Sequence, residues 1–314
     1  MDYHIIMKKF FKLLFLTPMI LFNSSCSPST PVDPPADPVP VDVIIISGQS
    51  NAVGCTKSKE IEKTIGAIAY QDYMSGFPGI KIAYDCWTKD DNGRFYSQNK
   101  SKDENFVKVM LGQGNQLLTF GPEIGMAEEL NEEYSGKVFI IKYACGASNL
   151  KDDWAKRDSP MYPRLIAYVK KQMKNLEDAN YIPTIKAFCW MQGEGDAWDG
   201  YYQEYLANTR EMVTNMREDL KDLAGNKDIP FIDAGINNSK NDSGLVWPYY
   251  KKVNEAKVAF SEESENNIYI DTIEAGMHTN VEPRGDVDPC HYDSDSEILL
   301  GKLFARNLKQ FLAK

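Results

Sequence analysis

Short apolar runs alternate with amphipathic stretches along residues 41–314. The first run, Val43 to Ile46, stops abruptly at the small polar turn Ser47-Gly48-Gln49-Ser50. Four further runs follow, at residues 138–141, 185–191, 229–234 and 268–271. Runs rich in β-branched residues indicate buried parallel strands, and helical patterns between them indicate helices on both faces of a sheet. The pattern therefore predicts an α/β domain with a five-stranded parallel sheet.

Five helices are predicted between and after these strands. Pro122 fits the first position of one helix, which apolar residues at helical spacing extend towards Gly136. Ser294 and Glu297 have the spacing of a capping box at the start of the last helix. The predicted helices cover residues 122–134, 162–176, 201–223, 249–260 and 295–312.

The N-terminal residues have the pattern of an export signal. In residues 1–25, three lysines precede an apolar run at 13–22, which is too short to cross a membrane as a helix. Small residues then lead to Cys26, as in bacterial lipoprotein signals whose cysteine is lipidated, although a plain cleavable signal remains the alternative. Residues 26–40 contain six prolines and should form a stiff tether. We expect an exported protein held at the cell envelope by a lipid anchor.

The charge and the cysteine content of the sequence exclude some classes of partner and metal site. The net charge of −10 lies in residues 41–314, because the first forty residues carry three lysines and three acids. An acidic domain binds phosphate backbones poorly, so nucleic acid is not an expected partner. Five of the six cysteines follow the leader, an odd number whose disulfide pairing stays open. No Cys/His spacing typical of a zinc site occurs, so no metal is expected.

Loops at three predicted strand ends carry small polar residues. Ser50 follows the first strand, Gly146 the second, and the block Gln192-Gly193-Glu194-Gly195-Asp196 the third. The carboxyl ends of parallel strands meet at one edge of a sheet, where α/β proteins bind ligands. Ser50 is therefore a candidate nucleophile, although a serine there could equally cap the next helix. Gly146 could offer its backbone N–H where a side chain would block approach.

His291 is the candidate general base. The sequence has three histidines, of which His4 belongs to the leader. Asp288 stands three residues before His291 and could orient its ring and stabilise the imidazolium ion. His278 has no acid so close in the sequence. We therefore pair His291 with Ser50.

Five blocks, in order, resemble the SGNH-hydrolase superfamily, and within it the branch of sialate O-acetylesterase-like proteins and carbohydrate esterase family 6. The resemblance spans residues 43–292, nearly the whole domain. It implies a flavodoxin-like three-layer α/β/α sandwich and ester hydrolysis, usually deacetylation of a sugar, with no metal or organic cofactor. The matching blocks are residues 47–51, 120–123, 142–154, 190–196 and 288–291.

The resemblance also implies roles for individual residues. Ser50 is the nucleophile and His291 the base. The oxyanion hole would consist of the backbone N–H groups of Ser50 and Gly146 and the side-chain amide of Gln192. The acid that orients His291 stays open between Asp288 and Glu194.

Four residues are expected to contact the substrate: Gln49, Asn51 and Glu123 in the matched blocks, and Trp87 in the segment 55–118. This segment holds many aromatic residues with little periodicity. We expect it to form a lobe over the site, in which Trp87 or Tyr84 stacks on a sugar. The alternative is that its aromatic residues pack a small core of their own.

The predicted function is the removal of O-acetyl groups from carbohydrate by a Ser-His-acid site, as in acetylxylan esterases or sialate O-acetylesterases. An acetylated glycan is the expected partner. Two alternatives stay open. One is a surface glycan-binding protein that has lost catalysis on the same fold. The other is an esterase for a different acyl class.

Overall fold

The computed structural model of the chain describes residues 37–279, 281–282 and 287–312. The predicted signal sequence, Cys26 and most of the predicted tether lie outside these residues. None of the helices in the described part of the chain has the length and apolarity that a membrane crossing requires. Export and lipid anchoring therefore stay predictions.

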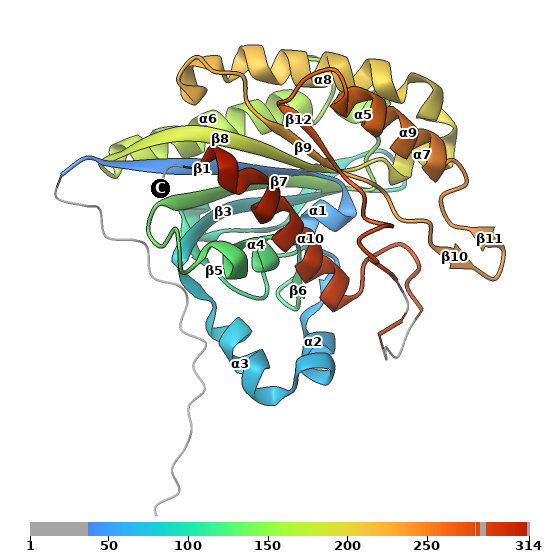
Figure 1. Ribbon diagram of the computed structural model, residues 1–314, viewed down its shortest axis with the longest axis horizontal. Coiled ribbons are helices and arrows are strands. Elements are labelled where there is room, and N and C mark those ends of the chain that lie inside the picture. The colour runs from blue at the N-terminus through green and yellow to red at the C-terminus, as the bar shows by residue number, and fades with distance from the viewer. Residues whose placement is uncertain (1–36, 280, 283–286, 313–314) are drawn as a thin grey trace, which may run out of the picture. The chain divides into compact units, whose positions relative to one another are not determined.

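An eight-stranded sheet forms the centre of the described residues (Figure 1). β4 (Phe95–Lys100) and β5 (Val107–Val109) pair antiparallel with β3 at one side of it. The predicted α/β architecture with a mostly parallel central sheet is confirmed. The parallel strands lie in the order β12 (Asn267–Ile270), β9 (Phe231–Ala234), β8 (Tyr181–Met191), β1 (Val39–Gly48), β7 (Val138–Gly146) and β3 (Phe77–Lys89).

The predicted count of five parallel strands is wrong, because β3 is a sixth. It pairs parallel with β7 from Ile80 to Thr88. Its buried apolar residues are interrupted by Lys81 and Asp85, so the sequence shows no continuous apolar run there. The segment 55–118 is therefore not a separate lobe, since its middle part belongs to the central sheet.

β1 lies inside the sheet, with β7 on one side and β8 on the other. Residues 43–46 have no exposed surface, which explains their continuous apolar run. At the end of β1, Gly48 stands opposite Ala144 of β7 and Met191 of β8. The loops that follow these three strands therefore start at the same edge of the sheet.

Helices cover both faces of the sheet. Figure 1 shows α6 (Tyr162–Asp178), α8 (Tyr205–Asp219) and α9 (Tyr250–Ser261) above it, and α4 (Glu123–Leu130) and α10 (Ser294–Leu308) below it. Three of the five predicted helices were too long, namely those at 122–134, 201–223 and 295–312. Short 3₁₀ turns flank α8 and follow α10 at Tyr201–Glu204, Lys221–Ala224 and Lys309–Phe311.

The predicted capping box of α10 does not form. Asp293 occupies the N-cap position, and the hydroxyl of Ser294 donates to Glu282 instead. Glu297 is fully buried, and its carboxylate oxygens have no hydrogen-bond partner among the described residues. Burial raises the pKa of Glu297 well above its usual value.

Two glycines allow α4 and α10 to touch along their backbones. A Cβ atom at Gly125 would lie 1.8 Å from the carbonyl oxygen of Ile298, and one at Gly301 would lie 2.0 Å from that of Pro122. No side chain fits in either position. The two helices therefore lie closer than ordinary side-chain packing permits.

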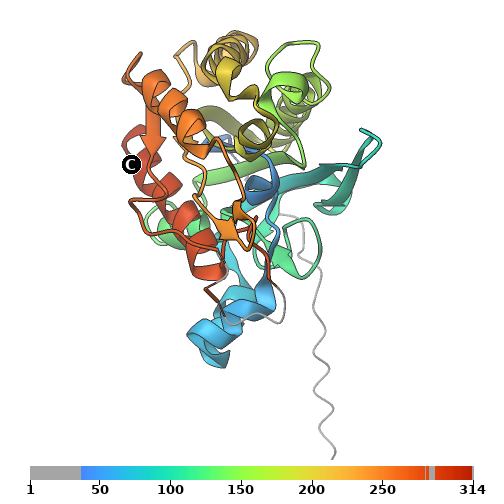
Figure 2. The same cartoon turned by 90° about the vertical axis from the view of Figure 1, so that its right-hand side faces the viewer.

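Smaller elements gather at the edge where the parallel strands end, which faces the viewer in Figure 2. α1 (Ser50–Val53) follows β1, α5 (Leu150–Asp153) follows β7, and α7 (Glu194–Asp199) follows β8. The hairpin β10 (Lys240–Asn241) and β11 (Gly244–Leu245) lies at the same edge. The remaining elements are α2 (Ser58–Ile65), α3 (Ala67–Ser75) and the pair β2 (Thr56–Lys57) and β6 (Thr119–Phe120).

Candidate active site

A cavity of about 630 Å³ opens where the parallel strands end. Ser50 of α1, Gly146 at the end of β7 and His291 before α10 all line it. These residues are far apart in the sequence, and the aligned ends of β1 and β7 bring the first two together. The structure thus places three of the predicted site residues around one space.

Ser50 is the first residue of α1 and does not cap it. The N-cap position belongs to Gln49, and no side chain caps this helix. The turn before it is sharp, because Gly48 has a φ of 139° and a Cβ atom there would lie 2.0 Å from the carbonyl oxygen of Met191. Only glycine fits this turn, which carries Ser50 from the buried strand to the cavity wall.

His291 is hydrogen-bonded to Asp288, as the spacing of the two residues predicts. The ring atom Nδ1 lies 2.8 Å from Oδ2 of Asp288. The other oxygen, Oδ1, accepts the backbone N–H groups of Cys290 and His291. Burial opposes the ionisation of Asp288, but the hydrogen bond and charge of His291 outweigh it and lower the pKa of Asp288 to about 2. Asp288 is therefore an ionised carboxylate at neutral pH.

A thiol also lies at the cavity wall with the histidine. Cys55, just beyond α1, lines the cavity together with His291. Burial alone would lower the pKa of His291, but Cys55 and Asp288 together raise it well above its usual value. This proximity could not be predicted, because Cys55 belongs to a segment without periodicity. Cys290 lines the same cavity. All five cysteines of the described residues are free thiols in the structure.

Glu194, the alternative acid, lies beneath the site and is almost fully buried. Its Oε1 accepts a hydrogen bond of 2.8 Å from Nδ2 of Asn51, and its Oε2 has no partner among the described residues. Burial raises the pKa of Glu194. The hydrogen bond to His291 therefore comes from Asp288, and Glu194 instead holds the residue that follows the serine.

Asn51 joins two loops and does not line the cavity. Besides its bond to Glu194, its Oδ1 accepts the backbone N–H of Tyr292 at 3.3 Å. The α1 turn and the loop of His291 are thereby fixed to each other. Asn51 thus lies behind the cavity wall, where it holds the loops of Ser50 and His291 together, and its contact with substrate stays a prediction.

Gln192 is also placed differently from the prediction. It is fully buried, and its Nε2 donates to Asp196 at 2.6 Å and to Gln49 at 3.2 Å. Its Oε1 accepts the hydroxyl of Tyr205 at 3.0 Å. Both amide hydrogens are thus engaged inside the protein, so the structure does not bring this amide to the cavity.

Gln49 lies where the amide of Gln192 was expected. Its Oε1 accepts three N–H groups, from Nε2 of Gln192 and from the backbones of Gly193 and Gly195, at 3.2, 3.3 and 3.2 Å. These bonds fix the orientation of the planar amide group, so that its oxygen faces the protein interior. Because Gln49 lines the cavity next to Ser50, its NH₂ group is left for a ligand.

Neither Glu123 nor Trp87 lines the cavity. Glu123 is fully buried and forms an ion pair of 2.8 Å with Lys142, whose ammonium group also donates to the carbonyl oxygens of Val53 and Gln113. This buried pair supports the end of α1 from below. Trp87 packs against Tyr143 and Arg164 outside the cavity. The guanidinium carbon of Arg164 lies 5.0 Å from the centroid of the Trp87 ring. Its neighbour Thr88 lines the cavity instead.

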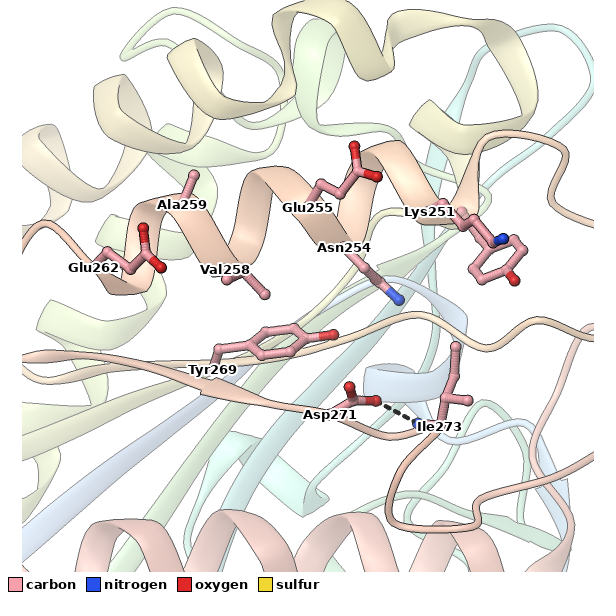
Figure 3. A pocket seen from close by; sticks show the side chains of 10 residues that line it. Lys251, Asn254, Glu255, Val258, Ala259, Glu262, Tyr269, Asp271 and Ile273 are labelled. Atoms are coloured by element: carbon pink, nitrogen blue, oxygen red, sulfur yellow. Dashed lines mark hydrogen bonds between the residues drawn. The ribbon is translucent and has the colours of Figure 1, made fainter.

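A second hollow, of about 500 Å³, lies between α9 and β12 (Figure 3). Asn254 on its wall is engaged with the backbone of Ile236, and Asp271 accepts the N–H of Ile273. Its lining includes neither a serine, a cysteine nor a histidine in the described part of the chain. It is not a candidate site for acyl transfer.

Residues 37–279, 281–282 and 287–312 contain no group of three or more acidic, His or Cys side chains suited to a metal.

The site can be compared with known proteins. A family model described as "Carbohydrate esterase, sialic acid-specific acetylesterase" matches residues 40–310. A solved protein from Arabidopsis thaliana is 20% identical, with a TM-score of 0.56 over 87% of this chain and 100% of that chain. NanS is 13% identical, with a TM-score of 0.54 over 88% and 98% of the two chains.

A third solved structure is a carbohydrate acetylesterase from Xanthomonas citri, which is 14% identical. It matches with a TM-score of 0.50 over 86% of this chain and 57% of its own. No curated protein matches the sequence. The structural likenesses show the fold, and the match of the family model covers almost all of the described residues.

Proposed function

The chain belongs to the carbohydrate esterase family of sialic acid-specific acetylesterases, and from this membership we propose that it removes O-acetyl groups from carbohydrate with Ser50, His291 and Asp288. The observation that carries the proposal is the hydrogen bond of 2.8 Å between His291 and Asp288 in a cavity that Ser50 also lines. A nucleophile, a base and an oriented acid at one site are the groups that acyl transfer needs.

The reaction follows from these positions. Asp288 holds Nδ1 of His291, which leaves Nε2 as the basic atom. The hydroxyl oxygen of Ser50 attacks the acetyl carbonyl carbon while His291 takes the hydroxyl proton. The tetrahedral intermediate collapses, and the sugar oxygen leaves with that proton from His291. Water, deprotonated by His291, then attacks the acetyl-serine and releases acetate.

The negative oxygen of the tetrahedral intermediate needs hydrogen-bond donors. The backbone N–H of Ser50 is one, because the first N–H groups of a helix have no acceptor within the helix. The backbone of Gly146 lines the cavity and is a second. We assign the third donor to the side chain of Gln49, in place of Gln192, because the amide of Gln192 is engaged inside the protein.

Replacing Gln49 with glutamate tests this assignment. The variant keeps an oxygen that can accept the N–H groups of Gly193 and Gly195, but it puts a second oxygen where the NH₂ group stood. We expect kcat for p-nitrophenyl acetate to fall by roughly 10²- to 10³-fold, with a smaller change in KM. An unchanged melting temperature would show that the fold survives. A variant that is folded and keeps its kcat would exclude Gln49 from the oxyanion hole.

The pH dependence of the reaction should report the influence of Cys55 on the pKa of His291. His291 accepts a proton only when it is neutral, so kcat/KM falls as the pH drops below its raised pKa. Replacing Cys55 with alanine removes one of the groups that raise this pKa. We expect the acidic limb of the profile to move to lower pH, measured with p-nitrophenyl acetate. A limb that stays in place would show that the thiol does not act on His291 in solution.

The proposed function is tested by labelling and by product analysis. A fluorophosphonate should modify Ser50, which peptide mass spectrometry locates, and the purified protein should release acetate from acetylated glycans. The alternative function, glycan binding without catalysis, predicts binding but neither labelling nor acetate. A series of p-nitrophenyl esters of increasing chain length separates acetyl esterases from esterases of other acyl classes, since the latter would prefer longer chains.

A further inference from the structure

Two tryptophans that the sequence analysis did not single out line the cavity beside the proposed nucleophile. Trp198 lies in α7, and Trp247 follows β11. Their rings meet edge to face, with centroids 6.5 Å apart and planes 82° apart. Trp198 is 59% exposed, although a large aromatic side chain is usually buried. An exposed ring on a cavity wall is a surface that a ligand can cover.

Hydrogen bonds fix the position of these rings relative to Ser50. The backbone N–H of Gly195, at the start of α7, donates to Oε1 of Gln49, the residue before Ser50. The backbone N–H of Tyr249 donates to the carbonyl oxygen of Ala197 at 3.2 Å, which ties the segment of Trp247 to α7. The two rings are thus held at a set place on the wall of the cavity that contains the serine.

The rest of the wall is polar but uncharged. Apart from His291 and the two cysteines, its polar side chains are amides and hydroxyls, and none of its lining residues in the described part of the chain is Lys, Arg, Asp or Glu. Amides and hydroxyls match sugar hydroxyl groups. A sugar carboxylate would instead call for a cation, most often arginine. Lys57 and Lys59 line a smaller adjoining hollow of about 250 Å³, outside this cavity.

We propose that Trp198 and Trp247 form a stacking subsite for an uncharged pyranose ring next to the acetylated residue. The C–H face of a pyranose is apolar and packs flat on an indole ring, while its hydroxyl groups reach the neighbouring amides. The preferred substrate is then an acetylated neutral oligosaccharide or polysaccharide, rather than a sialic acid, whose carboxylate finds no cation among the described residues of this wall. The proposal rests on the proposed esterase function and names its substrate class.

A comparison of substrates tests the proposal. The wild-type protein is given acetylated xylo-oligosaccharides as the neutral substrate, 9-O-acetylated sialic acid as the anionic one, and p-nitrophenyl acetate as a small ester that lacks a sugar. We expect kcat/KM for the neutral oligosaccharide to exceed that for the sialic acid by at least about tenfold. The reverse preference, with a KM for the sialic acid that rises in Lys59→Gln, would overturn the proposal.

Variants then test the residues. In Trp198→Ala, the ratio of kcat/KM for the oligosaccharide to that for p-nitrophenyl acetate should fall about tenfold, mainly through KM, and Trp198→Phe should recover most of it. Tyr96, a half-exposed aromatic residue of β4 outside the cavity, gives the matched control, because Tyr96→Ala should leave this ratio unchanged. A ratio that stays constant in Trp198→Ala would overturn the proposal.

A binding measurement separates this proposal from the esterase function. Unacetylated xylohexaose should quench the tryptophan fluorescence of Ser50→Ala, and Trp198→Ala in the same background should lose this response. Binding without any acetate release from the wild-type protein would refute the esterase function and leave the subsite standing. Acetate release from neutral oligosaccharides without the Trp198-dependent response would refute the subsite alone.

Discussion

Replacing Ser50 with alanine should lower kcat for p-nitrophenyl acetate by about 10⁵-fold or more, because removing a serine nucleophile disables the whole acyl-transfer unit. The substitution removes a single oxygen from a side chain that does not cap α1, so the fold should not change. The measurement is initial-rate hydrolysis, with the melting temperature as the check on folding. A folded Ser50→Ala protein that keeps more than a small fraction of the rate would refute Ser50 as the nucleophile.

The thiol beside the base requires its own control. Cys55 lines the cavity together with His291, so its thiol is a second candidate nucleophile there. Residual activity of Ser50→Ala should therefore be measured before and after treatment with iodoacetamide. If alkylation removes a substantial residual rate, and the double variant Ser50→Ala, Cys55→Ala lacks it from the start, the nucleophile is Cys55. We expect no such rate.

The substitution Asp288→Asn should lower kcat by about 10⁴-fold, because an amide at this position stabilises the wrong tautomer of His291. Glu194→Gln is the matched control. It changes the alternative acid in the same way, but its amide oxygen can still accept the hydrogen bond from Asn51, so its effect should be far smaller. The comparison uses kcat for the same ester at a pH where the wild-type rate is constant.

The ratio of the losses in kcat of these two variants identifies the acid that orients His291. If Glu194→Gln were as damaging as Asp288→Asn in kcat, with both proteins folded, the assignment of Asp288 alone would be wrong.

The dependence of stability on pH is a second measurement that reports the ionisation of Asp288. The pKa of Asp288 is about 2, below its unfolded value, so its contribution to stability is present above the unfolded pKa and is lost as the pH falls towards 2. The acidic limb of activity at higher pH belongs to His291.

The sequence predicts the parts of the fold in which local pattern and environment agree. β1 lies between two strands and under helices on both faces, so every residue of its centre is apolar and the run is visible. β3 was not predicted because Lys81 and Asp85 interrupt its apolar residues, and Lys81, which pairs with Lys108 of β5, is only partly buried. The capping box of α10 does not form because the hydroxyl of Ser294 donates to Glu282, twelve residues earlier in the chain.

Within the site, proximity in the sequence decided which predictions succeeded. Asp288 and His291 are three residues apart, and their bond could be foreseen. The burial of the Gln192 amide could not, because it depends on the contacts of Gln192 with Asp196 and Tyr205. The acidic partner of His278 could not be predicted either. It is Asp293, whose Oδ2 lies 3.0 Å from Nδ1 of His278 and which stands fifteen residues further along the chain.

The close contact of α4 with α10 joins the helices behind the two loops of the proposed site. α10 follows the loop of His291, whereas α4 carries Glu123, which supports the end of α1 through Lys142. Any side chain at Gly125 or Gly301 would force the two helices apart. The position of His291 relative to Ser50 therefore depends in part on two glycines that lie outside the cavity.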